Sequence, residues 1–281
     1  MTVPRFSFVQ LGDYEIHVTE WGDKRNPSVV LWHGLARTGR DFDELATALS
    51  DRFFVICPDT LGRGLSSWSK DPDKEYNIEF LSGMARDVLD HYDIARAIWI
   101  GTSMGGLIGM RMASGDLANR LSCLILNDIG PEIPQGAIDR ILTYAGNLPV
   151  FDALSEAQNW LMTTYKPFGP ASEAFWQRMV LSSVRRNDAG RLTLHYDPRI
   201  VVQFSTSADE LTSWDRYQRI SVPTHVIWGQ QSDILTDRIQ QRMQSEGPRP
   251  EVTVMHDCGH APSLSRAEDI EKVEEILKRL L

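Results

Sequence analysis

The sequence has 281 residues, of which 42% are hydrophobic and 24% charged, and its formal net charge is -9. A chain of this length and composition can bury a large core, and its acidic balance argues against nucleic acid as a partner. Neither a run of roughly 18 apolar residues nor a basic amino-terminal segment followed by an apolar stretch is present, so we expect a cytoplasmic globular protein with no membrane partner.

The chain opens with two strand-like runs, residues 6–11 and 14–20, separated by a Gly-Asp pair that suits a hairpin at a sheet edge. Short apolar runs follow, several nearly continuous, as in strands buried on both faces: residues 28–32, 53–57, 97–100, 121–126, 225–228 and 252–255. Helical periodicity separates them, most clearly in residues 81–92 and 270–280. This alternation predicts an α/β fold with a mostly parallel central sheet flanked by helices.

Residues 131–219, which we call the inserted segment, break the alternation. They carry helical patterns and aromatic residues but no convincing strand pair. We interpret them as a helical lid, with residues 1–130 and 220–281 forming the two parts of the core domain. Trp160 and Trp176 are candidates to line a substrate pocket between lid and core, and the alternative is that each packs the lid onto the core.

A G-x-S-x-G pattern centred on Ser103 follows the apolar run of residues 97–100. A tight strand-to-helix turn projects a serine hydroxyl free of neighbouring side chains, and small residues two before and two after it let the backbone close. Gly105, Gly109 and Ala113 recur every four residues, which gives the following helix a smooth face that can lie close to a sheet. We therefore predict a nucleophile elbow at Ser103.

A nucleophilic serine needs a base and an orienting carboxylate. His260 stands in a Gly-His pair after the last strand-like run, while Asp233 follows the preceding one and Asp128 follows residues 121–126. Because the carboxyl ends of parallel strands form the ligand crevice of an open α/β sheet, these loops can converge on the serine. His256 is a weaker candidate for the base.

Stabilisation of an oxyanion requires hydrogen-bond donors beside the serine. An early strand ends in His33-Gly34-Leu35. A chain that turns at Gly34 can aim the backbone N–H of Leu35 at the substrate carbonyl. The N–H of Met104, at the start of the helix after the elbow, is the second predicted donor. The imidazole of His33 is expected to brace this loop.

Arg37, just past this turn, could pair with a substrate carboxylate, or instead with a neighbouring acid such as Asp41. The three cysteines are widely spaced, and no histidine has ligand spacing with a second histidine or a carboxylate on one helical face. We therefore expect neither a metal site nor a cofactor.

The order Ser, Asp, His, together with the elbow and the His-Gly turn, resembles the α/β-hydrolase superfamily, in particular its lidded esterase and lactonase-like members. The resemblance covers nearly the whole chain. Residues 59–66 also resemble the family's D-x-x-G-x-G-x-S turn, whose role is structural.

The resemblance implies hydrolysis of a small-molecule carboxylic ester or lactone, with Ser103 as nucleophile, His260 as base and an aspartate as the orienting acid. Asp233 is preferred over Asp128, because its Trp-Gly-x-x-Ser-Asp setting resembles the usual acid loop. Carbon-carbon bond hydrolysis of a diketone acid, perhydrolysis, and a small-molecule receptor that retains the triad remain alternatives.

Overall fold

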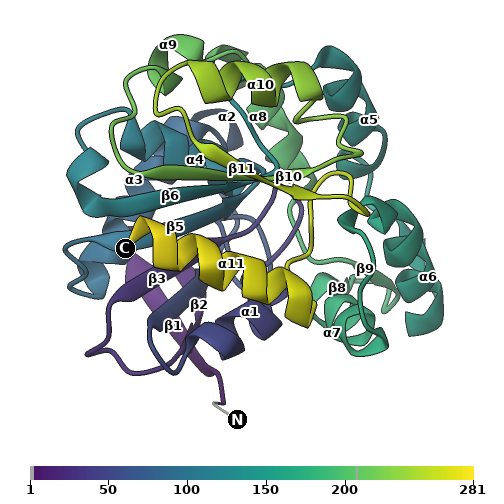
Figure 1. The fold of residues 1–281 in the computed structure, drawn as a ribbon. Helices are drawn as coiled ribbons and strands as arrows, with labels where there is room; N and C mark the ends of the chain where they lie inside the picture. The colour runs from purple at the N-terminus through teal and green to yellow at the C-terminus, as the bar shows by residue number, and fades with distance from the viewer. Residues whose placement is uncertain (1–2, 207) are drawn as a thin grey trace.

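A computed structural model of the protein, which describes residues 3–206 and 208–281, contains an eight-stranded sheet (Figure 1). Its strands are β1 (Arg5–Leu11), β2 (Tyr14–Trp21), β3 (Ser28–Trp32), β4 (Phe54–Pro58), β5 (Ala97–Thr102), β6 (Leu121–Asn127), β10 (Thr224–Gly229) and β11 (Glu251–Met255). Their spatial order is β1-β2-β4-β3-β5-β6-β10-β11.

The sheet is mostly parallel. β1 and β2 form the expected antiparallel hairpin at one edge, and β2 is also antiparallel to β4, whereas the other neighbouring strands are all parallel. The carboxyl ends of β5, β6 and β11, where Ser103, Asp128 and His260 follow, therefore point to the same edge. The predicted fold class is confirmed.

Helices cover both faces of the sheet. The core helices are α1 (Asp43–Leu49), α2 (Pro72–Glu75), α3 (Ile78–His91), α4 (Met104–Ala113), α10 (Asp237–Ser245) and α11 (Ala267–Leu280). Successive residues of β3 point to opposite faces of the sheet. Val29 belongs to the hydrophobic cluster that includes residues of α1 and α11, and Val30 belongs to the cluster that includes residues of α3 and α4. Burial on both faces explains why these strands are nearly continuous apolar runs.

The small-residue face of α4 lies close to the sheet, as predicted. A Cβ atom on Gly105 would lie 2.1 Å from the carbonyl oxygen of Trp32, and one on Gly109 would lie 2.6 Å from the ring of Trp99. Larger side chains would push the helix away from the strands that it covers.

Between β6 and β10 the chain leaves the sheet and forms α5 (Gln135–Ala145), α6 (Leu154–Thr164), α7 (Glu173–Ser183), α8 (Gln203–Thr206) and α9 (Trp214–Tyr217). It also forms a three-stranded antiparallel sheet from β7 (Val150–Phe151), β9 (Leu192–Leu194) and β8 (Val184–Arg186). The expectation that this segment holds no strand pair is therefore wrong, because strands of two or three residues are too short to show periodicity. Figure 1 shows α6, α7, β8 and β9 gathered at the right of the molecule.

The turn at residues 59–66 has the structural role that was expected. The buried carboxylate of Asp59 accepts hydrogen bonds from His17 Nδ1 at 2.8 Å and from the backbone N–H groups of Gly39 and Leu65. A Cβ atom on Gly64, whose φ is 53°, would lie 2.1 Å from this carboxylate. Asp59 therefore fixes the path of the loop that packs beside β2.

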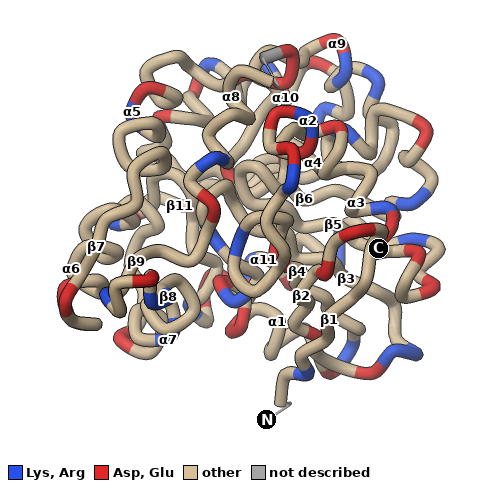
Figure 2. Tube along the Cα trace, turned by 180° about the vertical axis from the view of Figure 1, so that it is seen from behind, with Lys and Arg blue, Asp and Glu red and all other residues tan. Residues whose placement is uncertain are grey.

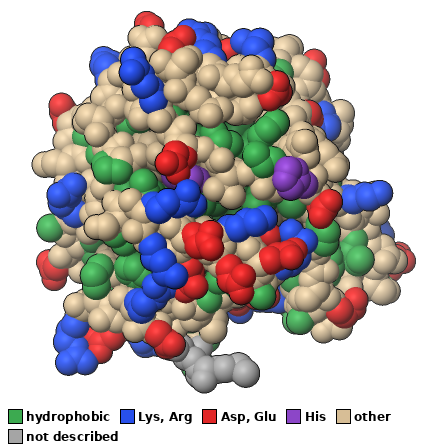
Figure 3. Space-filling view, in the orientation of Figure 1, with side chains coloured by type: hydrophobic (Ala, Val, Ile, Leu, Met, Phe, Trp, Pro, Cys, Tyr) green, Lys and Arg blue, Asp and Glu red, His purple; other side chains and the backbone are tan. Residues whose placement is uncertain are grey.

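Charged residues are distributed over the whole molecule. In Figure 2, Lys and Arg are interspersed with Asp and Glu, and in Figure 3 hydrophobic side chains reach the surface in small areas between charged ones. In the described ranges, no helix is both long and apolar enough to cross a lipid bilayer.

Candidate active site

Ser103 occupies the predicted turn between β5, which ends at Thr102, and α4, which begins at Met104. Its backbone is strained, with φ 52° and ψ -115°. A Cβ atom on Gly101 would lie 2.3 Å from the carbonyl oxygen of Gly105. The glycines on either side of the serine therefore permit the tight turn, as the pattern predicted.

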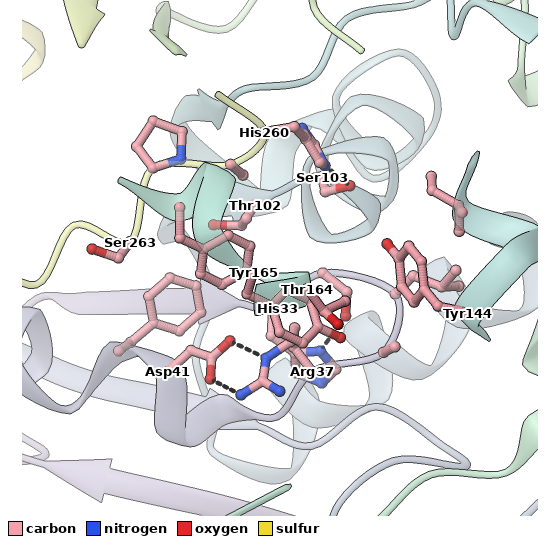
Figure 4. Close-up of a pocket in the computed structure, with 18 of the residues that line it drawn as sticks. His33, Arg37, Asp41, Thr102, Ser103, Tyr144, Thr164, Tyr165, His260 and Ser263 are labelled. Atoms are coloured by element: carbon pink, nitrogen blue, oxygen red, sulfur yellow. Dashed lines mark hydrogen bonds and ion pairs between the residues drawn. The ribbon is translucent and has the colours of Figure 1, made fainter. Parts of the chain in front are cut away.

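Ser103, His260 and Asp128 form a continuous hydrogen-bonded chain. His260 Nε2 lies 2.9 Å from Ser103 Oγ, and His260 Nδ1 lies 2.7 Å from Asp128 Oδ2. Figure 4 shows Ser103 and His260 next to each other in the wall of a cavity. The geometry can transfer a proton from the serine hydroxyl to an imidazole that a carboxylate holds in place.

The expectation that Asp233 orients His260 is wrong, because Asp128 occupies that position. The carboxylate of Asp233 is half exposed and pairs with Arg140 of α5, at 2.5 and 2.9 Å. Ser232, the residue before it, faces inward instead and donates a hydrogen bond to Asp128. The loop after β10 thus supports the acid but does not supply it.

Asp128 follows β6, which lies between β5 and β10 in the sheet. Since Ser103 follows β5, the two residues lie at the ends of neighbouring strands. Its carboxylate is fully buried and accepts hydrogen bonds from His260, from Ser232 Oγ and from the backbone N–H of Gly229. Burial raises the pKa of Asp128 above its ordinary value, while the bonds from His260 and Ser232 act to lower it. Three donors therefore surround the ionised form.

The loop after β3 lies against the serine. A Cβ atom on Gly34 would lie 3.6 Å from Ser103 Cβ, and Leu35 lines the same cavity as Ser103. Met104 is the first residue of α4, so its N–H has no acceptor within the helix. Over the described chain, neither this N–H nor that of Leu35 donates a hydrogen bond to another protein group. Both remain candidate oxyanion donors.

His33 is buried and holds the loop in place, as expected. Its Nε2 accepts a hydrogen bond from the backbone N–H of Thr60, so Nδ1 carries the proton and donates it to the carbonyl oxygen of Gly34. Burial lowers the pKa of His33 to about 4. His256, the weaker candidate for the base, is exposed and contacts Gln230.

Two hollows meet at His260. The first, which we call the inner cavity, has a volume of about 60 Å³, and its lining includes Leu35, Arg37, Ser103, Tyr144, Phe175 and His260. The second, which we call the outer hollow, has a volume of about 910 Å³, and its lining includes Arg140, Tyr144, Lys166, Asp233, Asp257 and His260. The inserted segment contributes to the walls of both hollows, through residues of α5 and residues 160–170 among others.

Arg37 lies in the wall of the inner cavity, but Asp41 already holds its guanidinium. The two side chains form two hydrogen bonds, at 2.6 and 2.8 Å, and Arg37 also donates to Ser183 Oγ (Figure 4 shows the pair). Burial acts to lower the pKa of Arg37, but the Asp41 carboxylate outweighs it and raises the pKa above its ordinary value. This ion pair is the alternative role that the sequence left open.

The two tryptophans proposed as pocket residues have different surroundings. Trp160 is half-buried and lines the outer hollow. Trp176 is buried with its ring against Phe175, and it does not belong to the lining of either hollow. Phe175, the residue before it, reaches the inner cavity instead. The aromatic content of the segment predicted a wall for a pocket, but not which rings form it.

The fold and this serine, histidine and aspartate arrangement are those of an α/β hydrolase. The chain belongs to the alpha/beta hydrolase family, whose model matches residues 29–273. It is 37% identical over 275 residues to a 3-hydroxybutyrate-oligomer hydrolase of Cupriavidus necator, a match that covers 92% of this chain and 93% of that one. The crystal structure of an alpha/beta hydrolase from Novosphingobium aromaticivorans superposes with a TM-score of 0.87 at 29% identity, covering 99% of each chain.

Proposed function

We propose that this protein is a carboxylic ester hydrolase that acts on short esters of 3-hydroxy acids through an acyl-enzyme. The observation that carries the proposal is the hydrogen-bonded chain from Ser103 through His260 to Asp128, with separations of 2.9 and 2.7 Å. Nucleophile, base and orienting acid lie within the distances that acyl transfer requires.

In the proposed reaction, His260 Nε2 takes the Ser103 proton as the hydroxyl oxygen attacks the ester carbonyl. The N–H groups of Leu35 and Met104 stabilise the negative oxygen of the tetrahedral intermediate. The ester bond then breaks, and the leaving alkoxide takes the proton from His260. Water attacks the acyl-enzyme by the same route, which releases the carboxylic acid and restores the serine.

The inner cavity supports a short acyl group with a polar substituent. Three aromatic side chains, Phe42, Phe168 and Phe175, provide apolar wall, while the Arg37–Asp41 ion pair provides a polar region. A 3-hydroxyacyl chain has both an apolar methyl group and a hydroxyl group that such a wall can accommodate. The Cupriavidus necator relative, which is named for 3-hydroxybutyrate oligomers, supports the same substrate class.

The inserted segment, residues 131–219, is proposed to act as the lid of this site. Tyr144 and Thr164 from this segment line both hollows beside His260. A cover of this kind excludes water from the reacting carbonyl until the substrate has bound.

The proposal is tested by a fluorophosphonate probe and a panel of p-nitrophenyl esters. We expect one covalent adduct in the intact mass spectrum, which Ser103→Ala removes, and a fall in turnover of roughly four to six orders of magnitude in that variant. Its melting temperature should change little, because Ser103 is a turn residue at a cavity surface. Turnover above about a tenth of the wild-type rate would rule out Ser103 as the nucleophile.

The alternatives are separated by adding a vinylogous diketone acid, hydrogen peroxide and a partner-binding assay to this panel. A protein that forms the adduct but prefers a vinylogous diketone acid to every ester would be a carbon-carbon bond hydrolase, and one that needs hydrogen peroxide for turnover would be a perhydrolase. A ligand-dependent partner without ester turnover would indicate a receptor.

A further inference from the structure

We propose that the outer hollow binds the leaving alcohol of a 3-hydroxyacyl oligomer, with Lys166 pairing with its free carboxylate, and that the inner cavity accepts one unit from the hydroxyl end. The enzyme would then shorten oligomers from the hydroxyl end, one unit per turnover. This inference rests on the proposed ester hydrolysis and adds to it the direction of cleavage and a residue for recognition of the chain end.

The two hollows differ in size far more than two interchangeable subsites would. The inner cavity, at about 60 Å³, is small enough to limit the group that it accepts to a short one. A 3-hydroxybutyryl group, with four carbons and two oxygens, is a short group. The 910 Å³ of the outer hollow exceeds the needs of one unit and can hold a longer chain.

The position of His260 decides which part of the substrate enters which hollow. The lining of the inner cavity includes Ser103 and the predicted oxyanion donor Leu35, whereas that of the outer hollow includes His260 but neither of those two residues. The acyl carbon bonds to Ser103 and the leaving oxygen takes its proton from His260. The acyl group therefore belongs on the side of the inner cavity, and the alcohol extends past His260 into the outer hollow.

In an oligomer of 3-hydroxy acids, the leaving alcohol always ends in a carboxylate. Two cations and two acids line the outer hollow: Arg140 and Lys166, with Asp233 and Asp257. Asp233 holds Arg140 through two hydrogen bonds. Lys166 is exposed, and in the ranges that the structure describes its amine has no ion pair.

Lys166 is therefore the cation that is free to pair with an incoming carboxylate. Asp257 is also exposed, and in the described chain no cation pairs with it. Its charge acts against an anionic ligand in the same hollow, so Lys166 and Asp257 should have opposite effects on a substrate with a free acid end.

The charge recognition is tested with the linear dimer of 3-hydroxybutyrate as the free acid and as its terminal carboxamide, which is neutral and keeps the same ester bond. We expect Lys166→Gln to lower kcat/KM for the acid by about two- to fivefold, mainly through KM, since an exposed ion pair contributes little. Turnover of the carboxamide should stay the same. Asp257→Asn should raise kcat/KM for the acid by a similar factor.

Lys278→Gln is the matched control, because Lys278 is an exposed lysine of α11 that does not line either hollow. It should leave both substrates unaffected. An equal change for acid and carboxamide in Lys166→Gln, or the same change in Lys278→Gln, would overturn the role of Lys166.

The direction of cleavage is tested on a trimer that carries deuterium only in its hydroxyl-terminal unit. The first monomer released should contain the label, and an unlabelled first monomer would mean that the longer acyl group enters the inner cavity, which contradicts the inference. Turnover of simple esters such as p-nitrophenyl butyrate distinguishes failure of this inference from failure of the proposed function. If the protein hydrolyses them but releases unlabelled monomer, only the inference fails, and if it turns over no ester, the proposed function itself fails.

Discussion

Replacing Asp128 by Asn should disable the enzyme while keeping its shape. The side-chain amide can still accept the hydrogen bond from Gly229, but its NH₂ group is a donor and would face the Nδ1–H of His260. His260 then avoids two opposed donors by moving its proton to Nε2, the atom that must accept the proton of Ser103. Loss of the correct tautomer costs about 10⁴ in kcat, equivalent to about 5 kcal/mol of transition-state stabilisation.

The control is Asp233→Asn, which removes the carboxylate that the sequence favoured as the acid. That carboxylate is half exposed and, among the residues that the structure describes, pairs only with Arg140, so kcat should stay within about threefold and stability within about 1 kcal/mol of wild type. Initial rates on p-nitrophenyl butyrate measure both variants. Comparable losses of kcat in Asp233→Asn and Asp128→Asn would refute the assignment of the acid.

Thermal unfolding of Asp128→Asn shows whether lost activity reflects a lost fold. Burial raises the pKa of Asp128, so the folded state holds this proton more tightly than the unfolded state does. The ionised carboxyl therefore carries a destabilisation that grows as the pH rises from its unfolded pKa through its folded pKa. The amide lacks it, so the variant should melt at least as high as wild type at pH 7.

Three further predictions concern the framework. Gly105→Ala should cost about 1–3 kcal/mol of stability, because its Cβ would meet the carbonyl oxygen of Trp32 in β3. Gly83→Ala, in the middle of α3 with open space around it, should instead add about 0.5–1 kcal/mol of stability. Chemical denaturation of both variants measures the two changes. Burial lowers the pKa of His33 from 6.5 to about 4, so the folding stability of wild type should fall by about 3 kcal/mol as the pH falls from 6.5 to 4. In urea titrations over this pH range, His33→Gln should show a smaller loss of stability. Arg37→Met should cost about 3–5 kcal/mol of stability by leaving the carboxylate of Asp41, whose side chain is only 11% exposed, without its partner. The further change Asp41→Leu should restore most of this loss, as a double-mutant cycle will show.

Much of the framework could be predicted because it depends on local patterns. Burial on both faces makes the central strands continuous apolar runs, and the turn at Ser103 requires small residues at fixed positions, so each leaves a signal within a few residues of sequence. His260 could be located in the same way, because it follows the last strand in a Gly-His pair. In contrast, β7, β8 and β9 are so short that their pairing depends on contacts between distant parts of the inserted segment.

The choice between two aspartates could not be made from such patterns. Asp128 and Asp233 both follow strands whose carboxyl ends meet at the same edge of the sheet. Asp128 comes directly after the last residue of β6, whereas Asp233 comes four residues after the end of β10. Which carboxylate reaches His260 is decided by the path of the intervening residues, and that path turns Ser232 inward and Asp233 outward.

The two acids contact different parts of the molecule: Asp128 holds His260, whereas Asp233 holds the inserted segment. Asp128 is buried in the core and is held by Gly229 and Ser232, also from the core. Asp233 instead contacts Arg140 on α5, in the inserted segment, at the rim of both hollows. Breaking this exposed pair alone would cost about 1 kcal/mol or less. The contacts that orient His260 involve neither Asp233 nor Arg140, so loss of this pair would leave the proton-transfer chain intact.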